Sequence, residues 1–432
     1  MKALTARPGA QRRPAYSSVT PAVHAEVMAE GADVLLEHPG SLGVPLCFAL
    51  RDFMLWVCTP AGERAALFGP GAGDPRRAGL AAARGEPELW APLLTLAQMT
   101  DAPERADAVR LVHAVRSVAR WAERAGAPAT RLAFTQAAAL ALPDQPSAAL
   151  EAARQARDLA RHAQAETWFR RAIRLARGRD WESYAWGFIG LGVLYMRAGN
   201  LPAARAVMAR ALRAARKRRL RGVAGSVHHH LFNLTSDAGR MEEAYQHARS
   251  ALQAYGPAHP RLSALAHDLG CYWADQGYFS RAEPMIEGAV QLLPDTSERL
   301  IALANVVRVS AGAGNRTRYE SARSQVMAAA ADPAMSGSVA EVLLLVAHGD
   351  SSAGEWERAE SAATRAHQLS RERGEARIQM RAEAQLEAIR AARVLAIRTS
   401  VPETEALAVQ AEALAIQLRE SLGRAAVAAR AA

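Results

Sequence analysis

An internal repeat of nearly constant length is the feature that most constrains the fold. Short turns recur at residues 160, 199, 239, 277, 314 and 354, so successive turns lie 39, 40, 38, 37 and 40 residues apart. Each turn separates two stretches with helical hydrophobic spacing, and all but the first of these positions are glycine. A period of this length predicts stacked helix-turn-helix units, each of which buries its apolar face only against its neighbours.

Two copies of the repeat share one residue pattern. The first contains Leu191, Gly192, Tyr195, Gly199, Asn200, Ala204, Met208 and Ala211, preceded by Phe188. The second contains Leu269, Gly270, Trp273, Gly277, Phe279, Ala282, Ile286 and Ala289. This pattern resembles the tetratricopeptide repeat (TPR), in a variant with a period of about 37–40 residues instead of 34. The small residue after leucine lets the two helices of a pair approach closely, and the turn glycine tolerates positive φ.

The resemblance implies an all-α chain, a right-handed α-solenoid of TPR-like repeats. We expect six repeats over residues 146–374, the fifth of them degenerate because Tyr319 replaces the usual small alanine. Residues 375–432 should supply capping helices, at about 375–400 and 403–422, because a solenoid needs a polar end.

The segment before the repeats is less regular. Residues 1–21 combine proline, serine and arginine and predict a disordered basic arm. Residues 22–100 should form a small N-terminal module of uncertain class, because the apolar run 45–57 fits both a helix and a strand. Residues 101–145 predict a helical pair leading into the solenoid, with Asp101 as the first N-cap.

Composition and motifs argue against several classes of protein. Three cysteines, Cys47, Cys58 and Cys271, form no CxxC pair, which excludes a disulfide framework and a cysteine zinc site. Neither a transmembrane run nor a secretory signal is apparent, so we expect a cytoplasmic protein. No nucleotide-binding or catalytic motif occurs, so we expect no cofactor, no metal and no enzymatic activity in the repeats, while an activity in residues 22–100 stays open.

In the family that the repeats resemble, the first helix of each pair lines a concave groove that binds a peptide or protein. The groove residues implied here are Arg154, Arg157, Trp186, Val193, Met196, Arg197, His229, Asn233, Asp237, His267, Cys271, Asp275, Arg308, Glu341 and His348. Asn233 is the most suggestive of these, because an amide can hydrogen-bond both N–H and C=O of an extended peptide. An incidental polar residue on an exposed helix is the equally weighted alternative. For Cys271, a small core or groove residue is favoured over a reactive thiol.

Positive charge is concentrated in the first two repeats. Residues 150–221 hold 16 arginines and one lysine against five acids, whereas the whole chain carries a formal charge of +10. The densest part is a basic patch at the end of a second helix, made of Arg210, Arg213, Arg216, Lys217, Arg218, Arg219 and Arg221. Such a field attracts acidic protein, nucleic acid or anionic lipid, although cations also simply complement a helix C-terminus.

The favoured hypothesis is therefore a TPR adaptor that binds a peptide segment or a protein partner, acidic or not, in its groove. The alternatives are a regulatory receptor linked to peptide sensing or transcription, and a nucleic-acid-associated protein that uses the basic patch. The fourth hypothesis is an enzyme whose catalytic unit is the N-terminal module, residues 22–100. The absence of a recognisable helix-turn-helix motif in residues 22–100 weighs against the transcription-linked receptor, and the absence of interleaved aromatics weighs against single-strand binding.

Overall fold

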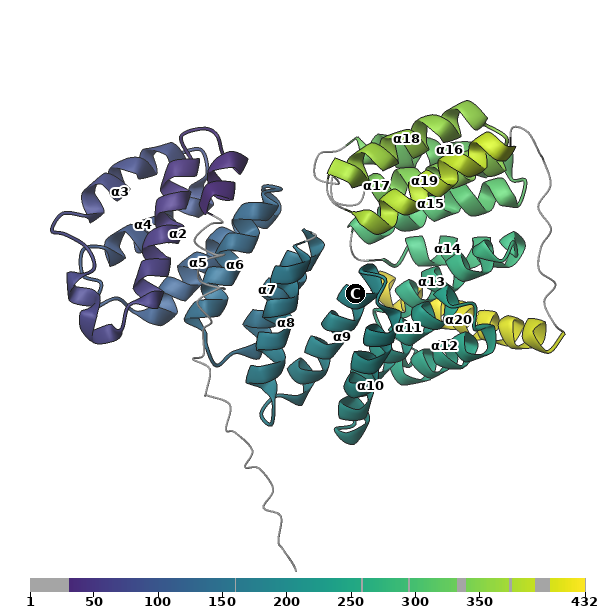
Figure 1. The fold of residues 1–432 in the computed structure, drawn as a ribbon, viewed down its shortest axis with the longest axis horizontal. Helices are drawn as coiled ribbons and strands as arrows, with labels where there is room; N and C mark the ends of the chain where they lie inside the picture. The colour runs from purple at the N-terminus through teal and green to yellow at the C-terminus, as the bar shows by residue number, and fades with distance from the viewer. Residues whose placement is uncertain are drawn as a thin grey trace, which may run out of the picture. The chain divides into compact units, whose positions relative to one another are not determined.

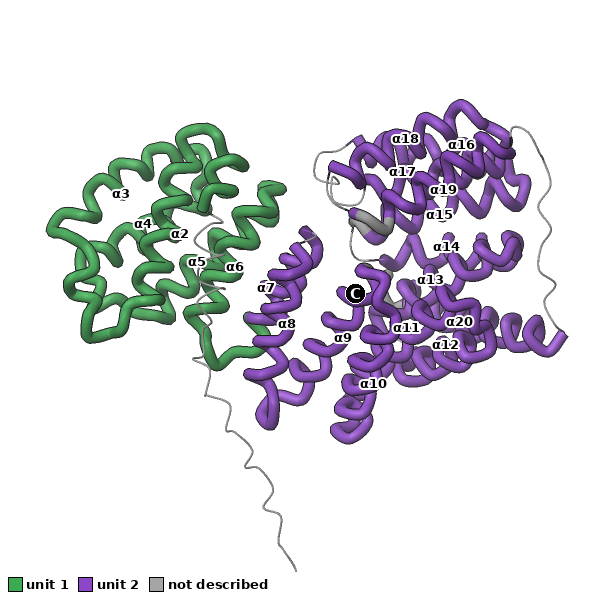
Figure 2. Tube along the Cα trace, viewed as in Figure 1, with its two compact units in different colours: residues 1–148 green, residues 149–432 purple. Residues whose placement is uncertain are grey.

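The computed structural model describes residues 31–159, 161–257, 259–293, 296–331, 339–372, 375–392 and 405–431. Helices and turns account for these ranges, and none of the residues in them forms a strand. The chain divides into two compact units, Met1–Ala148 and Ala149–Ala432 (Figure 2). The predicted basic arm, residues 1–21, lies outside the described residues. None of the described helices is long and apolar enough to span a membrane.

The first unit is helical throughout its described part. After a helical segment at residues 31–37 come α2 (Gly43–Cys58), α3 (Gly73–Gly79), α4 (Pro87–Met99), α5 (Ala108–Arg124) and α6 (Pro128–Ala141), with 3-10 turns at Ala61–Ala66 and Leu80–Ala83. The ambiguous run 45–57 lies within α2, which contacts α4 and α6, while α4 contacts α5. The helical pair α5–α6 thus packs with the N-terminal helices, and the division between the units falls after residue 148.

The first helix of that pair begins later than expected. Asp107, not Asp101, is its N-cap, and the Asp107 carboxylate accepts a hydrogen bond from the Val109 amide at 2.9 Å. Asp101 is instead paired with Arg77. The intervening segment contains Pro103 and forms turns before α5 starts.

The second unit is a TPR-like α-solenoid of successive helix pairs (Figure 1). The pairs are α7 (Pro146–Asp158) with α8 (His162–Ala176), α9 (Trp181–Arg197) with α10 (Leu201–Lys217), α11 (Arg221–Asp237) with α12 (Met241–Tyr255), α13 (Leu262–Asp275) with α14 (Phe279–Val290), α15 (Thr296–Gly312) with α16 (Arg316–Ala330), and α17 (Val339–Ser352) with α18 (Trp356–Glu372). Contacts between adjacent pairs, such as α10 with α11 and α14 with α15, join the pairs into one stack.

The turns and the close helix contacts of the repeat are both present. Glycines 199, 239, 277, 314 and 354 all have positive φ, between 69° and 83°. A Cβ on Gly270 would lie 2.6 Å from Ile286 Cγ1, and one on Gly192 would lie 2.4 Å from Met208 Cε. Real Cβ contacts are not this short, so glycine is what lets each first helix approach its second helix.

The degenerate repeat replaces close packing by a buried polar cluster. Tyr319 is fully buried, and its hydroxyl donates to Asp350 Oδ1 at 2.7 Å. Arg323 donates to both oxygens of the same fully buried carboxylate, at 2.8 and 3.1 Å. The larger side chain is accommodated because its only polar atom reaches a charged acceptor.

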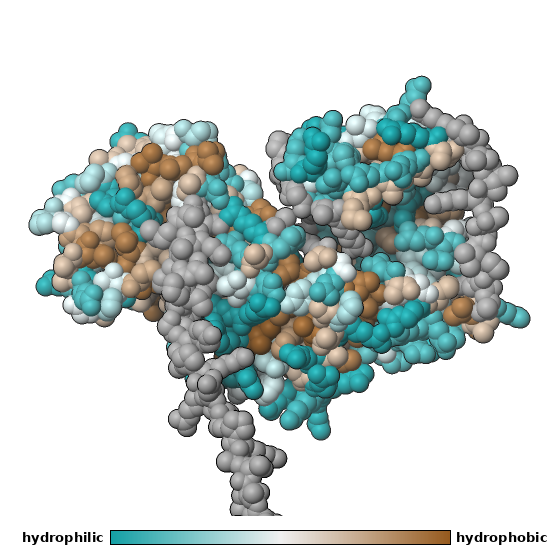
Figure 3. All heavy atoms as spheres, viewed as in Figure 1, coloured by the Kyte–Doolittle hydropathy of each residue, from teal (hydrophilic) through white to brown (hydrophobic). Residues whose placement is uncertain are grey.

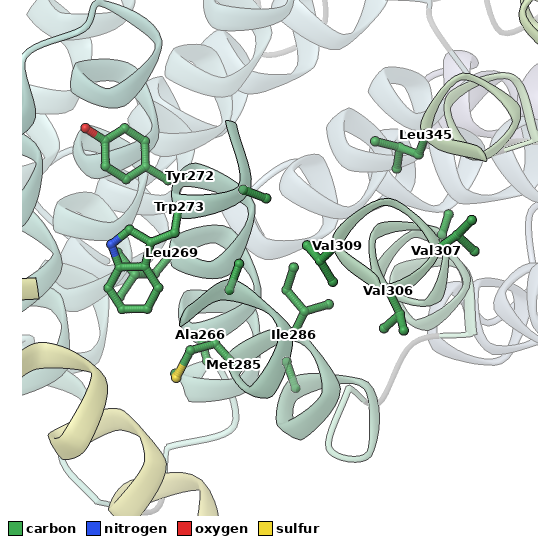
Figure 4. Packing of buried hydrophobic residues seen from close by; sticks show 14 of the residues in the cluster. Ala266, Leu269, Tyr272, Trp273, Met285, Ile286, Val306, Val307, Val309 and Leu345 are labelled. Carbon is green, nitrogen blue, oxygen red and sulfur yellow. The ribbon is translucent and has the colours of Figure 1, made fainter. Parts of the chain in front are cut away.

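One hydrophobic cluster runs through the middle of the second unit. Figure 4 shows Leu269 and Trp273 of α13, Ile286 of α14 and Val307 of α15 among its members. Trp273 is fully buried, and its indole N–H donates to the Tyr245 hydroxyl at 2.9 Å. This continuous core fixes the positions of α11, α13 and α15, the helices that carry most of the candidate site.

The two helices expected to cap the C-terminus separate. α19 (Ala376–Ala392) packs against α17 and α18 and continues the stack. α20 (Glu405–Ala431) instead contacts α12, α13 and α14, near the middle of the unit (Figure 1). Leu414, Leu418 and Leu422 are buried on α20, and this apolar stripe explains why the helix lies against the repeats.

Candidate functional site

A cavity of about 680 Å³ opens among the first helices of four successive pairs. It is lined mainly from α11, α13, α15 and α17, and Met196 of α9, Phe279 of α14 and Arg381 of α19 also belong to its lining. Its walls combine apolar surface from Phe232, Tyr272 and Leu345 with polar and charged side chains. The volume is within the range of ligand-binding sites in proteins.

Many of the groove residues expected from the sequence line this one cavity. They are Met196, Asn233, Asp237, His267, Cys271, Asp275, Arg308, Glu341 and His348. The helical frame carried over from the repeat thus brings together residues from five helices whose positions in the sequence span about 150 residues.

Other expected groove residues lie elsewhere. Arg154 is placed with its guanidinium 5.5 Å from the centre of the Trp186 ring, and Arg157 is paired with Asp158. Val193 packs against the hydrophobic cluster of α9, α10 and α11. His229 is 2% exposed and does not line the cavity. The side chain of Arg197 is outside the described residues.

Asp268, which the sequence reasoning missed, is the centre of the cavity's polar network. Its Oδ2 accepts hydrogen bonds from Asn233 Nδ2 at 2.7 Å and lies 2.9 Å from His229 Nε2. Its Oδ1 lies 3.0 Å from His267 Nδ1. The signal available in the sequence was an acidic residue directly after His267. Which side chains Asp268 contacts follows only from the packing of α11 against α13.

This network corrects the expectation for Asn233. We expected its amide to face solvent and be free for a peptide, but its NH₂ group is engaged by Asp268. The reason is that α11 and α13 lie side by side, so a carboxylate on the second helix reaches the amide of the first. The first role of Asn233 is therefore to hold the Asp268 carboxylate in place through this hydrogen bond.

The protonation states of the network are strongly coupled. Burial raises the pKa of Asp268, but hydrogen bonds and charge from His229 and His267 outweigh it and hold the pKa well below its ordinary value. Burial lowers the pKa of His267, but the adjacent Cys271 sulfur and the Asp268 carboxylate hold it well above its ordinary value. The network therefore favours an imidazolium–carboxylate pair at neutral pH.

The other ring nitrogen of His267 faces the cavity residues. His267 Nε2 lies 3.4 Å from Cys271 Sγ and 3.2 Å from Asn305 Nδ2. Cys271 is half-buried, whereas Asn305 is 3% exposed. A thiol, an imidazole and a carboxylate thus form a chain of contacts along one face of α13.

Some buried polar atoms on cavity residues have no hydrogen-bond partner among the described residues. Examples are Asn305 Oδ1, Ser236 Oγ and Arg308 Nε. Arg308 uses its other nitrogens, which donate to Asp275 Oδ1 at 2.5 Å and to the Cys271 carbonyl at 3.2 Å. Buried polar groups are normally paired, so the fold itself leaves these shielded atoms unsatisfied beside the cavity.

The three consecutive histidines of α11, His228, His229 and His230, contact different partners. His228 Nδ1 lies 3.1 Å from His247 Nδ1, while His229 faces Asp268 and the His230 ring stacks on that of His229. Burial, with His247 and Arg216 nearby, lowers the pKa of His228 to about 4. Within the described ranges, no group of three or more histidine, cysteine or acidic side chains is arranged to hold a metal ion.

The basic patch lies at the end of α10, where hydrophilic side chains gather in the space-filling view (Figure 3). All seven of its side chains are exposed. Several are used within the fold, because Arg218 lies 4.4 Å from the Trp181 ring centre, Arg210 lies 5.9 Å from that of Phe188, and Arg216 contacts His228 at 3.4 Å. Among the described residues, Arg213, Lys217 and Arg219 have no recorded partner.

Arg219 is also the one described non-glycine residue with positive φ, at 56°. It occupies the turn between α10 and α11, whereas Gly178 and Gly256 provide positive φ in the turns before α9 and α13. A side chain in this conformation is strained by about 1 kcal/mol relative to glycine. The fold does not require arginine there.

Comparisons with known proteins give distant structural neighbours. No protein-family model and no curated protein matches the sequence. Among solved structures, the apo form of RapI has a TM-score of 0.46 and 12% identity, over 64% of this chain and 99% of that chain. Aspartyl phosphate phosphatase F from Bacillus subtilis has a TM-score of 0.44 and 9% identity, over 92% of this chain and 100% of that chain. A Rap protein complexed with Competence and Sporulation Factor has a TM-score of 0.42 and 12% identity, over 89% of this chain and 99% of that chain.

The fold follows from this chain's own geometry. Its successive helix pairs, its positive-φ turn glycines and the close contacts at Gly192 and Gly270 are the features of tetratricopeptide-type packing. The chain is a TPR-like helical-repeat protein.

Proposed function

We propose that the cavity binds an extended peptide segment, either free or within a partner protein, and that the protein acts as a non-enzymatic adaptor or regulator. The observation that carries this proposal is the cavity of about 680 Å³, whose lining combines apolar, polar and charged side chains from successive first helices. A peptide backbone alternates N–H donors and C=O acceptors, so it can hydrogen-bond polar side chains such as those of Ser236, Asn305 and Arg308 at once.

The walls of the cavity suit side chains of mixed character. Phe232, Tyr272 and Leu345 offer apolar surface, which favours one or two apolar side chains in the occupant. Glu341 and Arg381 carry opposite charges at the cavity and have no recorded ion-pair partner among the described residues. A peptide with both an apolar and a charged residue therefore fits better than a strongly acidic one.

The experiment is selection of heptapeptides from a random displayed library on the immobilised protein, followed by calorimetry with the enriched peptide. We expect Ser236→Ala and Asn305→Leu each to weaken binding of that peptide about 2- to 13-fold, the effect of one hydrogen bond of about 0.5–1.5 kcal/mol. Ser250→Ala is the matched control, because Ser250 lies on α12 and its hydroxyl donates to the Gln246 carbonyl. Equal affinity in all four proteins, or no enriched peptide, contradicts the proposal.

The basic patch supports a second candidate function, recruitment of an acidic protein segment. Its observation is the set of seven exposed basic side chains at the end of α10, of which Arg213, Lys217 and Arg219 have no recorded partner among the described residues. Reversing Arg213, Arg216, Arg218 and Arg219 to glutamate should abolish binding of a polyglutamate probe at low salt. If random duplex DNA binds more tightly than polyglutamate, with a log–log salt slope near −0.9 per phosphate, the surface is a nucleic-acid site instead. If the wild type binds neither probe, the patch has no such role.

A further inference from the structure

The chain of contacts along α13 has a chemistry that peptide binding does not use. Cys271 is half-buried at the cavity, so its sulfur is within reach of a small molecule. His267 Nε2 lies 3.4 Å from the sulfur, and His267 Nδ1 lies 3.0 Å from the Asp268 carboxylate. Thiol, imidazole and carboxylate in this order form the arrangement that generates a thiolate nucleophile.

Asp268 is well placed to keep the imidazole charged and oriented. His229, which is 2% exposed, and Asn233 both contact its other oxygen, so the carboxylate is fixed from α11. A carboxylate held in this way fixes the orientation of His267 and stabilises its imidazolium form. A cation directly against a sulfur stabilises the thiolate.

A second side chain contacts the same imidazole. Asn305, which is 3% exposed, lines the same cavity, and its NH₂ group lies 3.2 Å from the same His267 Nε2 that contacts the sulfur. Its Oδ1 is buried and has no hydrogen-bond partner among the described residues, so the wall beside this imidazole holds an acceptor that the fold itself leaves unsatisfied.

We propose that Cys271 is a modification site, a thiolate that a small hydroperoxide entering the cavity oxidises to a sulfenic acid. The sulfur attacks the terminal oxygen of the hydroperoxide, so that an S–O bond forms and the O–O bond breaks. Sulfur loses two electrons and the peroxide is reduced, leaving as an alcohol after taking a proton from His267 Nε2. The products are the sulfenic acid, neutral His267 and one alcohol molecule, which balances charge and atoms; a cellular thiol reverses the oxidation.

Oxidation would also change the cavity. Loss of the proton from His267 removes its charge from the pair with Asp268, and the added oxygen occupies space beside Asn305. Oxidation is therefore expected to lower affinity for the cavity's occupant, and this one consequence rests on the proposed peptide-binding function. The reactivity of the thiol does not.

The other two cysteines provide an internal comparison. Cys58 is exposed, yet burial raises the pKa of its thiol. Burial likewise raises the pKa of Cys47, with smaller opposing effects from Arg51 and Asp52. If exposure alone decided reactivity, Cys58 would react first; if the His267 contact decides it, Cys271 reacts first at acidic and neutral pH.

The pH dependence of Cys271 has to reflect every charged group around it. These are Asp268 and Asp275 on α13, His229 and Asp237 on α11, Arg308 on α15, Glu341 and His348 on α17, and Arg381 on α19. Among the described residues, the hydrogen-bonded chain that reaches the sulfur runs through His267 to Asp268, so removal of that pair is the decisive perturbation.

The test measures alkylation by iodoacetamide and sulfenic acid formation with hydrogen peroxide, each quantified by mass spectrometry at the three cysteines of the intact chain. At pH 6.5 we expect Cys271 to be alkylated at least about tenfold faster than Cys58, whose rate should still rise about tenfold per pH unit. Peroxide with a dimedone trap should mark Cys271 first.

Variants separate activation from simple exposure. His267→Gln and Asp268→Asn should each lower the Cys271 rate at pH 6.5 at least about tenfold and make its pH profile resemble that of Cys58. His367→Gln is the matched control, because His367 pairs with Glu383 away from the cavity. The wild-type comparison of the three cysteines needs no variant, so misfolding of a variant leaves the test intact. Cys271 reacting no faster than Cys58, or an unchanged rate in a folded His267→Gln, overturns the proposal, whether or not any peptide binds.

Discussion

The Asp268 network offers a sharp test of the site's energetics through Asp268→Asn. The substitution keeps the side chain's shape but removes the charge on which His229, Asn233 and His267 converge. A hydrogen bond to a charged group contributes about 1.5–3 kcal/mol, and a neutral one about 1 kcal/mol. Losing the His267 pair and weakening the other two bonds should lower the free energy of unfolding by about 3 kcal/mol in total.

The two pKa shifts determine how the stability cost of Asp268→Asn varies with pH. The pKa of His267 is raised in the folded protein, so its contribution is complete below about pH 6.5 and is lost as pH rises through the folded value. The pKa of Asp268 is lowered, so its contribution is complete above about pH 4 and is lost as pH falls through the folded value. The cost of Asp268→Asn should therefore be largest between about pH 4 and 6.5 and shrink in alkali.

The measurement is urea unfolding followed by tryptophan fluorescence at pH 5.5 and in steps up to pH 9.5. Asp275→Asn is the matched control, because Asp275 lines the same cavity but its side chain is 59% exposed in its pair with Arg308. An exposed pair of this kind contributes less than about 1 kcal/mol. The reasoning is refuted if Asp268→Asn costs no more than Asp275→Asn at pH 5.5, or if its cost is the same at every pH.

Three further predictions concern the fold. Gly270→Ala should destabilise more than Gly192→Ala, by about 1–3 kcal/mol, because the first meets a branched side chain and a backbone oxygen and the second meets the end of a flexible methionine; equal urea midpoints would contradict this. Arg219→Gly should stabilise by up to about 1 kcal/mol by relieving the positive φ, and a lower melting temperature would mean that the arginine supports the turn. Leu418→Ala should cost about 2–5 kcal/mol and expose α20 to limited proteolysis, whereas wild-type resistance would show that α20 does not depend on its contact with α12–α14.

Much of the fold followed from short-range sequence signals. Glycines at a spacing of 37–40 residues mark turns because positive φ strains other residues, and all five of those predicted have it. The small residues at 192 and 270 predicted close helix contacts, which the geometry confirms. These signals act within one helix pair, so a linear pattern was enough to read them.

Interactions between pairs could not be read in the same way. A repeat frame predicted which residues share the groove face, and nine of them do line one cavity, but it could not show that Asp268 reaches across to Asn233 and His229. That contact depends on the rotation of α11 against α13, which the core around Trp273 sets.

The difference between local and tertiary information also applies to the position of the C-terminal helix and to the charge on the histidine beside the Cys271 thiol. The sequence by itself predicted a helix at about 403–422, because helical pattern is a local property, and α20 covers Glu405–Ala431. Only tertiary structure decided that α20 lies on α12–α14 instead of on α19. Likewise, the i, i+4 spacing of His267 and Cys271 was visible in the sequence. Whether that histidine is charged was decided by Asp268 and by the partners that packing brings to Asp268 from another repeat, because a buried charge is stable only where its partners are fixed.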